Sequence, residues 1–223
     1  VHLLKHTNYD LFYKDRVADG KYVILDNSTV ELGEPWPMQQ YLASAMRLGA
    51  SEILLPDWLY NITRTLDAAE SGLRWAEEAG YSGQIMGIPQ GNTQEEWVEC
   101  LEEMLGMGIS SIGISRRYLD KFGTSRLLAC YATHHVASSM NIAVSIHLLG
   151  AGLPPEVEVA PCLRLPYVVG VDSAMPSYFA KAGQKLGFNA VRPEAQRDLE
   201  NDVYSDDLLA VNIGWWRQLC AQQ

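Results

Sequence analysis

The chain has 223 residues, 48% of them apolar and 20% charged, with a formal net charge of −10 at pH 7. This length allows one domain with a substantial core, and the composition is ordinary for a globular protein. The longest apolar runs, such as 22–25 and 53–55, are too short to cross a bilayer, and no signal-peptide pattern opens the chain. We therefore expect a cytoplasmic protein without membrane contact, and the acidic charge argues against strong non-specific attachment to nucleic acid.

Predicted strands alternate along the chain with predicted helices. Short apolar runs rich in β-branched residues predict the strands, and a 3.6-residue apolar period among good helix formers predicts the helices. In chain order the strands are expected at 22–26, 52–56, 84–89, 111–115, 143–148 and 167–171, with the end of a seventh at 1–4. The clearest helices are expected at 37–48, 63–79, 93–105, 124–139 and 208–219. Gly49, Gly80 and Gly108 stand just past three of these helices, where a residue with positive φ often ends a helix.

Polar or glycine-containing groups follow nearly every predicted strand. They are DNS at 26–28, PD at 56–57, PQG at 89–91, SRR at 115–117, HLLG at 147–150 and VDS at 171–173. Continuous apolar strands between helices indicate a parallel sheet, and in a (β/α)8 barrel the strand ends converge on the face that carries the active site. An open doubly wound sheet has the same alternation, but no GxGxxG or GxxxxGK(S/T) motif follows an early strand. We predict one catalytic domain over 1–223, a TIM-like (β/α)8 barrel of the α/β class whose first strand is lacking or truncated.

The cysteines Cys100, Cys130, Cys162 and Cys220 lie far apart in the sequence. No CxxC pair exists, so we expect reduced thiols rather than a zinc site built by local spacing. The sequence predicts no metal and no cofactor.

Three aspartates, Asp26, Asp57 and Asp172, stand directly after predicted strands. Each alone could simply cap a helix or hold a loop, but three around one barrel mouth form a plausible site. Carboxylates that share a pocket can divide into a nucleophile and a general acid/base, because different surroundings separate their pKa values. Such a pair suits attack at a sugar C1′, where the transition state has oxocarbenium character. The residues alone therefore indicate glycosyl chemistry, either hydrolysis or transfer.

Six short motifs stand in order along the chain. They are LDNSTVELGE (25–34), LPDW (55–58), GIPQGN (87–92), GISRR (113–117), HLLGAG (147–152) and GVDSAMPSYFAKAG (170–183). In order and approximate spacing they resemble the motifs of the queuine/archaeosine tRNA-guanine transglycosylase family. They are most similar to its shorter phage-encoded relatives, which place 7-deazaguanines in DNA. The resemblance implies an enzyme that exchanges guanine in nucleic acid through a covalent glycosyl-aspartate intermediate, in the host cytoplasm if phage-encoded.

The resemblance also implies roles for the three aspartates. Asp172, in VDSA, matches the family's nucleophile, which attacks C1′ and expels guanine. Asp26, in LDNS, matches the aspartate that manages the proton at N9 as one base leaves and the next attacks. Asp57 matches the carboxylate that reads the N1–H and exocyclic amine of the base, a pairing in which a carboxylate accepts two parallel N–H bonds.

Further residues match the family's base pocket. Gln90 and Gly91 match a glutamine–glycine pair that lines the pocket, where glycine lets the ring approach the backbone. Ser115 lies in the segment that replaces the family's glycine-rich loop, and the resemblance implies backbone contacts there. His147 and Leu148 match a segment that packs against the base.

The implied partners are a nucleic acid, DNA rather than tRNA, and a free 7-deazaguanine base. Arg116, Arg117 and Lys181 are the candidates for phosphate contact, and a partner subunit or homodimer could supply the missing positive surface. The family's tRNA enzymes carry a CxCxxC…H zinc site after the nucleophile, and no such motif follows Asp172. Asn27 stands where those enzymes have serine, and Lys181 replaces a family arginine.

Three alternatives remain open from the sequence. The chain could be a tRNA-guanine transglycosylase, a nucleoside or glycoside hydrolase on the same barrel, or a non-catalytic barrel that serves as a scaffold subunit.

Overall fold

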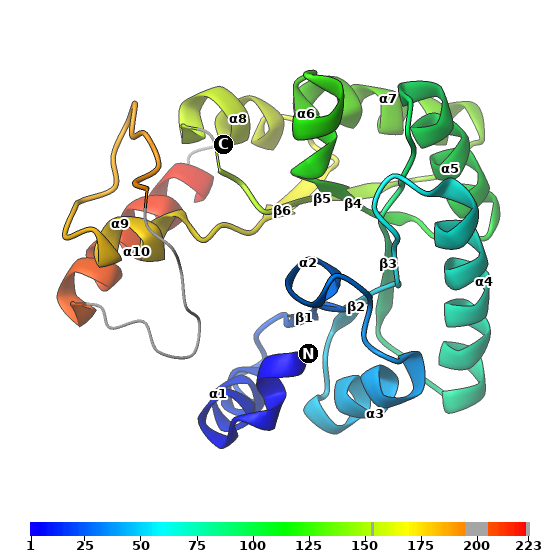
Figure 1. Ribbon diagram of the computed structural model, residues 1–223, viewed down its shortest axis with the longest axis horizontal. Helices are drawn as coiled ribbons and strands as arrows, with labels where there is room; N and C mark the ends of the chain where they lie inside the picture. The colour runs from blue at the N-terminus through cyan, green and yellow to red at the C-terminus, as the bar shows by residue number, and fades with distance from the viewer. Residues whose placement is uncertain (153, 195–204, 222–223) are drawn as a thin grey trace. The chain divides into compact units, whose positions relative to one another are not determined.

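The computed structural model describes residues 1–152, 154–194 and 205–221. Its contacts divide the chain into two compact units. Unit 1 comprises Val1–Gly113 and His135–Val144, and unit 2 comprises Ile114–His134 and Ser145–Gln223. Figure 1 shows that strands alternate with helices in both units. The expected single catalytic domain stays a prediction.

Unit 1 contains a parallel sheet in which neighbours in the chain are neighbours in space. Its elements are η1 (His2–Lys5), α1 (Thr7–Ala18), β1 (Ile24–Leu25), α2 (Thr29–Leu32), α3 (Met38–Leu48), β2 (Glu52–Leu54), α4 (Ile62–Ala79), β3 (Gln84–Gly87), α5 (Gln94–Gly106) and the start of β4 (Ser111–Ser115). The order β1-β2-β3-β4 requires a crossover between each pair of strands, and a helix supplies each one. The carboxyl ends of β1, β2 and β3 therefore lie at one edge of the sheet.

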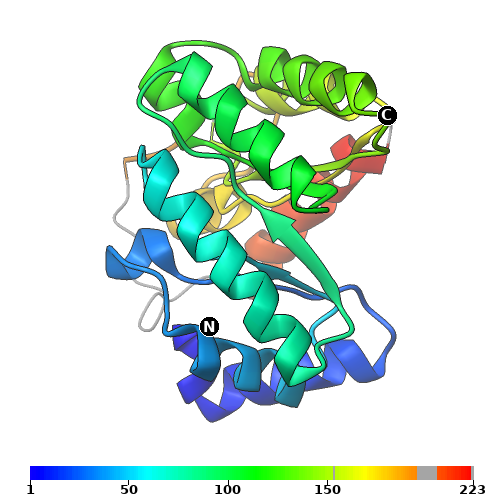
Figure 2. The ribbon, with the colours of Figure 1, turned by 90° about the vertical axis from the view of Figure 1, so that its right-hand side faces the viewer.

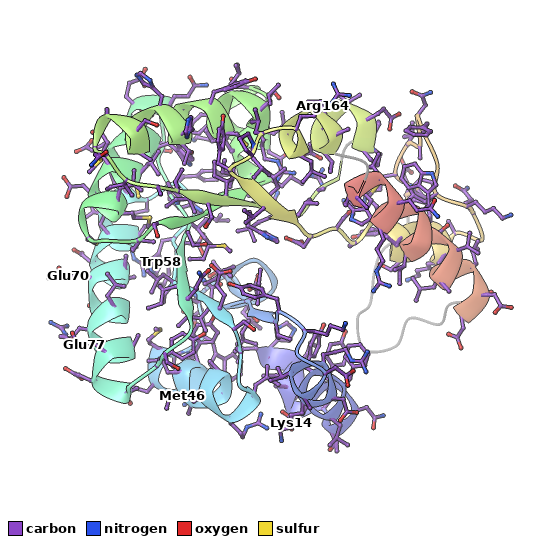
Figure 3. All side chains as sticks on the ribbon, turned by 180° about the vertical axis from the view of Figure 1, so that it is seen from behind. Lys14, Met46, Trp58, Glu70, Glu77 and Arg164 are labelled. Carbon is purple, nitrogen blue, oxygen red and sulfur yellow. The ribbon has the colours of Figure 1, made fainter. Side chains whose placement is uncertain are left out.

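Local sequence explains the ends of the helices in unit 1. The Asn61 side chain accepts the backbone N–H of Arg64 at the start of α4, and Thr93 accepts that of Glu96 at the start of α5. Gly80 ends α4 in the left-handed conformation at φ 69°, which glycine adopts without steric cost. The outer face of α4 is polar, and Figure 3 shows Glu70 and Glu77 pointing away from the body of the unit.

The core of unit 1 lies between the sheet and the helices α3, α4 and α5. Figures 1 and 2 show α4 and α5 running beside each other along the sheet. The large side chains with almost no exposure in this core are Tyr41, Ile53, Leu54, Leu55, Met86, Leu101, Met104 and Leu105. Each such side chain contributes about 1.5–3 kcal/mol by leaving water, which gives the strand ends a rigid support.

Unit 2 repeats the alternation with the end of β4 and the strands β5 and β6. Its elements are α6 (Arg117–Phe122), α7 (Arg126–Ser139, of which the last residues belong to unit 1), β5 (Ser145–Leu149), α8 (Pro155–Leu163), β6 (Val168–Val171), α9 (Met175–Lys181) and α10 (Asp206–Ala221). β5 and β6 pair in parallel with a register irregularity between Ile146 and His147. Val159, Phe179 and Trp216 join α8, α9 and α10 in one apolar cluster.

The structure confirms the six internal strands and the five clearest helices expected from the sequence, with ends shifted by a few residues. The strand expected at 1–4 is wrong, because His2–Lys5 form a 3-10 helix. Its apolar residues read as a strand only because the run is too short to show a helical period. Within the described ranges, none of the helices is both long and apolar enough to cross a membrane.

Among the described helices that were not expected from the sequence, α1 and α8 are the longest. No residue of α1 is fully buried, so it lacks the apolar period that marks a core-facing helix. α8 begins at Pro155 and contains Pro161, and prolines ordinarily indicate a loop. The fold that the structure gives is an α/β arrangement with a parallel sheet whose order follows the chain.

Candidate functional site

Asp57 lies directly after β2 in the interior of unit 1, with 6% of its surface exposed. The side-chain amide of Gln90 donates to its Oδ2 at 2.7 Å, and that of Asn27 donates to its Oδ1 at 3.2 Å. Asn27 follows β1 and Gln90 follows β3, so the carboxylate joins the loops after three consecutive strands. We call Asn27, Asp57 and Gln90 the Asp57 cluster.

Both amides of the Asp57 cluster are fixed in orientation by further bonds. The Asn27 oxygen accepts the backbone N–H and the hydroxyl of Thr29, and its amide nitrogen also donates to the Leu55 carbonyl. The Gln90 oxygen accepts the backbone N–H of Tyr60 at 3.2 Å. Because an amide oxygen can only accept, these bonds leave the N–H groups facing Asp57. The carboxylate is therefore held in one geometry.

The surroundings of Asp57 change its acidity. Burial raises the pKa of Asp57 to about 6 from its ordinary 3.8, the hydrogen bond from Asn27 lowers it, and the neighbouring charge of Asp26 raises it again. The hydrogen bond from Gln90 opposes the shift. A carboxyl with a pKa close to neutral can change protonation at physiological pH, as acid/base and ligand-reading groups do.

Asp26 follows β1 and is exposed. Its Oδ1 accepts the backbone N–H of Ser28, which ties the carboxylate to its own loop. Asp26 is close enough to Asp57 for its charge to act on the pKa of that group. The structure thus brings together three of the residues singled out in the sequence, Asp26, Asp57 and Gln90.

Two non-glycine residues in these loops have left-handed backbone conformations, Ser28 at φ 64° and Tyr60 at φ 61°. Such positions cost on the order of 1–3 kcal/mol and persist where the surroundings impose them. Here Ser28 lies next to Asn27, and the Tyr60 N–H is bound by Gln90. The strain therefore accompanies the loops that hold the Asp57 cluster.

Gly91 is buried, and the start of α5 packs directly on it. A Cβ at this position would stand 2.5 Å from the backbone nitrogen of Trp97 and 2.8 Å from the carbonyl carbon of Glu96. The glycine is required by this helix packing. An approach of a base ring to its backbone stays a prediction.

Trp58 follows Asp57 and is half-buried on the inner side of α4 (Figure 3). The guanidinium carbon of Arg64 lies 3.3 Å from the centroid of its ring, so one face of the indole is covered by a cation.

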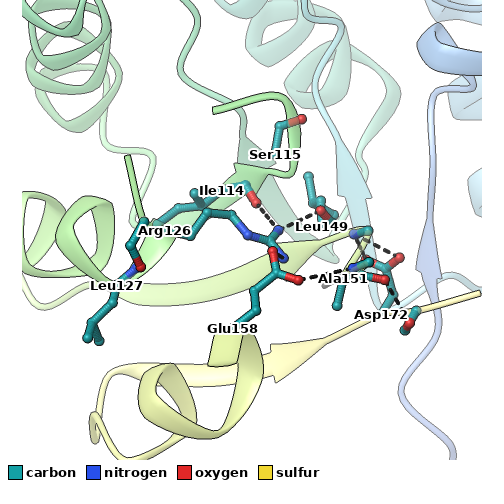
Figure 4. A network of polar contacts seen from close by, with 12 residues as sticks. Ile114, Ser115, Arg126, Leu127, Leu149, Ala151, Glu158 and Asp172 are labelled. Atoms are coloured by element: carbon teal, nitrogen blue, oxygen red, sulfur yellow. Dashed lines mark hydrogen bonds and ion pairs between the residues drawn. The ribbon is translucent and has the colours of Figure 1, made fainter. Parts of the chain in front are cut away.

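Asp172 lies directly after β6 in unit 2 and has a very different environment. Its side chain is 57% exposed. The backbone N–H of Gly150, in the loop after β5, donates to both carboxylate oxygens at 3.1 Å, and His147 Nε2 lies 3.4 Å from Oδ1. Figure 4 shows Asp172 beside Ala151 of the same loop. The carboxylate is therefore oriented by the protein while it remains open to solvent.

His147 and Leu148 face opposite sides of β5, as neighbours on a strand do. A Cβ at Gly170 would stand 2.5 Å from His147 Nδ1, so glycine in β6 leaves the space that the imidazole fills beside Asp172. The Leu148 side chain is completely buried, and its carbonyl accepts the backbone N–H of Asp172 at 3.2 Å. Contact of either side chain with a base stays a prediction.

The remaining candidates from the sequence follow β4 and end α9. The Ser115 hydroxyl accepts the backbone N–H of Arg117, and the Arg117 guanidinium pairs with Asp120 at 3.3 Å. Lys181 is exposed in the last turn of α9. Phosphate contact by Arg117 and Lys181, and substrate contact at Ser115, therefore stay predictions.

Arg116 differs from the other two cations. A Cβ at Gly152 would stand 2.4 Å from its Nη1, so the guanidinium lies against this glycine. Its Nε is buried and has no hydrogen-bond partner among the residues that the structure describes. A guanidinium with a spare donor is suited to an anion.

Sequence reasoning missed several residues of these two groups. Asn27 was noted only as a departure from serine, yet its amide binds Asp57. Gly150 and Gly170 lie in the motifs HLLGAG and GVDSAMPSYFAKAG. The presence of glycine in these motifs was the signal that could have identified the two residues. In the described part of the chain, no group of three His, Cys, Asp or Glu side chains is placed to hold a metal ion.

No family model matches this chain, and no curated protein matches it. The resemblance to guanine transglycosylases rests on the six sequence motifs.

Proposed function

We propose that this chain is a guanine transglycosylase on a variant of the (β/α)8 barrel. It exchanges guanine in nucleic acid, DNA rather than tRNA, for a free 7-deazaguanine base. The observation that carries the proposal is the contrast between two carboxylates at the carboxyl ends of parallel strands. Asp57 is buried and held by two amides, whereas Asp172 is oriented but open. Different surroundings are what divide a pair of carboxylates into separate roles.

Asp172 is the nucleophile in this proposal. An oxygen of its carboxylate forms a bond to C1′ of the nucleotide while the C1′–N9 bond breaks, and the electron pair leaves with guanine, which takes up a proton at N9. The 7-deazaguanine then attacks C1′ through its own N9, which loses a proton, and the ester bond to Asp172 breaks. The exposure of the Asp172 side chain supports this role, because a nucleophile must be reached by its substrate.

Asp57 is the group that reads the base. Its carboxylate accepts one amide N–H on each oxygen, and in this proposal its remaining acceptor capacity takes the N1–H and exocyclic amine of guanine. The fixed amides of Asn27 and Gln90 support a reading role, since they hold the carboxylate in one plane. In this proposal the base also lies against Gln90 and Gly91.

Asp26 manages the proton at N9. It is exposed and acts on the pKa of Asp57, so proton transfer and base reading are electrostatically linked in unit 1. The pKa of about 6 also makes Asp57 itself a competent proton carrier. Separate alanine variants of Asp26 and Asp57 distinguish the two roles.

Arg116 is the best of the three phosphate candidates because its buried Nε is unpartnered among the described residues, whereas Arg117 already pairs with Asp120. The net charge of −10 leaves little general attraction for nucleic acid, so a homodimer or a partner subunit would supply further positive surface.

The test is incubation of the protein with DNA or tRNA and radiolabelled guanine. Incorporation of label without net loss of base supports exchange, and Asp207→Asn, an exposed aspartate of unit 2, is the matched control for Asp172→Asn. Release of base without incorporation would replace exchange with hydrolysis. No reaction on either polymer, with a folded protein, would favour a scaffold, and one tightly held zinc per chain with activity on tRNA would favour the tRNA enzyme.

A further inference from the structure

Unit 2 contains a buried ion pair beside the loop that orients Asp172. Arg126 of α7 and Glu158 of α8 face each other in Figure 4, with 2.6 Å between Arg126 Nη2 and Glu158 Oε1. Their side chains are 0% and 4% exposed. A buried ion pair is weak evidence for stability, because removing two charges from water offsets most of their attraction. The pair therefore calls for a role other than stability.

Two further bonds of the pair end on one short segment, residues 149–152. Arg126 Nη1 donates to the carbonyl of Leu149 at 2.7 Å, and Glu158 Oε2 accepts the N–H of Gly152 at 3.0 Å. The same Nη1 donates to the carbonyl of Ile114 at 3.1 Å, which ties the segment to the end of β4. The ion pair thus holds the segment at its first and last residues.

The middle of this segment holds Asp172. Gly150 donates its backbone N–H to the carboxylate, and Ala151 donates its own to the backbone carbonyl of Asp172 at 2.9 Å. Gly150 has φ 68°, a conformation that an unrestrained glycine exchanges freely with others. The direction of its N–H is therefore set by the two anchored ends of the segment.

We infer that Arg126 and Glu158 are positioning residues for Asp172, which act by fixing the segment 149–152 and so the Gly150 N–H that orients the carboxylate. The inference rests on the proposed function only in naming Asp172 as a nucleophile. Misplacement of a reacting group by about 1 Å can cost on the order of 10² in rate, so the pair governs the bond-forming step without touching substrate.

The decisive variant replaces both charges, as Arg126→Met with Glu158→Leu. A buried ion pair replaced by apolar residues of similar volume often leaves stability unchanged, so this protein is expected to fold while its carbonyl and N–H anchors are lost. Arg126→Lys is the conservative companion, because an ammonium keeps the charge but lacks the fork that reaches two carbonyls and a carboxylate. Arg164→Met, an exposed arginine just past α8, is the matched control.

Two measurements are made on each folded variant. The first is the pH titration of the Gly150 amide proton by NMR, which follows ionisation of Asp172 in the native protein and is identified by its loss in Asp172→Asn. The second is the single-turnover rate of adduct formation with DNA, alongside the affinity for guanine. The double variant is expected to lose the Gly150 titration and to react about 10²-fold more slowly with guanine affinity within twofold, whereas Arg164→Met keeps all three values.

The inference is overturned if the folded double variant retains the Gly150 titration, whatever its rate. It is also overturned if the wild type forms the adduct and the double variant, having lost the titration, forms it at the same rate as the wild type. If the wild type forms no adduct, the proposed function fails, and the titration alone decides whether the pair positions the Asp172 carboxylate.

Discussion

Asp57 and Asp172 follow parallel strands in the two units, yet the protein treats the two carboxylates in opposite ways. Burial raises the pKa of Asp57, and the side-chain amides of Asn27 and Gln90 bind its carboxylate and fix its plane. Asp172 is exposed and bound by the backbone N–H of Gly150, which directs it without covering it. The comparison teaches that the surroundings, and not the residue type or its place after a strand, assign the role.

The largest effect is expected from removing the open carboxylate. Asp172→Asn keeps the size of the side chain but removes the nucleophilic oxygen, so exchange is expected to fall by at least about 10³-fold. Guanine affinity is expected to stay near wild type, because the proposed function assigns base reading to Asp57 of unit 1. Single-turnover kinetics and a direct binding assay with guanine measure the two quantities. A variant that keeps its rate would show that the open carboxylate is not the reacting group.

The next effect separates the two carboxylates of unit 1. Asp26→Ala is expected to slow turnover by about 10²–10⁴ through the lost acid/base group while guanine affinity changes little. Asp57→Ala is expected mainly to weaken guanine binding and relax base choice, since the donors of the base lose their acceptor at a cost of about 1–3 kcal/mol. Asp67→Ala, an exposed aspartate of α4, serves as control. The opposite pattern would reverse the two roles.

The raised pKa of Asp57 predicts a pH dependence of both binding and stability. Its pKa of about 6 lies above the ordinary 3.8, so the folded protein holds a proton between these values that the unfolded chain has released. Stability is therefore expected to fall as pH rises from about 4 to about 6, by up to about 3 kcal/mol, and guanine affinity to weaken about tenfold per unit below pH 6.

Chemical unfolding and guanine binding measured from pH 4 to pH 8 test this dependence. Asp57→Asn cannot ionise and is expected to remove the fall in stability. A wild type whose stability and guanine affinity are both flat between pH 4 and pH 7 would contradict a buried, titrating Asp57.

The smallest effect concerns the packing of α5 against Gly91, the residue that follows Gln90 of the Asp57 cluster. Gly91→Ala would bring a methyl group to within 2.5 Å of the Trp97 backbone nitrogen, so α5 must shift, at a cost of about 1–3 kcal/mol. Gly106→Ala at the end of α5 meets nothing within 4 Å and is expected to stabilise by about 0.4–1 kcal/mol. Denaturant unfolding of both variants measures the difference. Equal stabilities of the two variants would show that α5 can shift to accommodate a methyl group at Gly91.

Much of the fold could be predicted from sequence because the strands are short apolar runs separated by helices with clear ends. Thr93 and Gly80 marked the start of α5 and the end of α4 by their own chemistry. The helix at 2–5 and the proline-containing α8 could not be read, since their patterns are those of a strand end and a loop.

The candidate residues could be predicted only where they stand at strand ends. Asp57 and Gln90 were found in this way, and their contact follows from parallel neighbours sharing an edge. Arg126 was not found, because a charged residue inside a helix ordinarily reads as exposed. Its burial depends on Glu158 and on two backbone carbonyls that only the folded unit brings to it.

The most direct test of the account is to trap the covalent intermediate and locate it. Incubation with guanine-containing DNA, denaturation and peptide mass spectrometry should find a nucleotide attached to the peptide that contains Asp172, and none in Asp172→Asn. An adduct on another residue, or retained adduct in the folded Asp172→Asn protein, would contradict the assignment of Asp172 as the nucleophile.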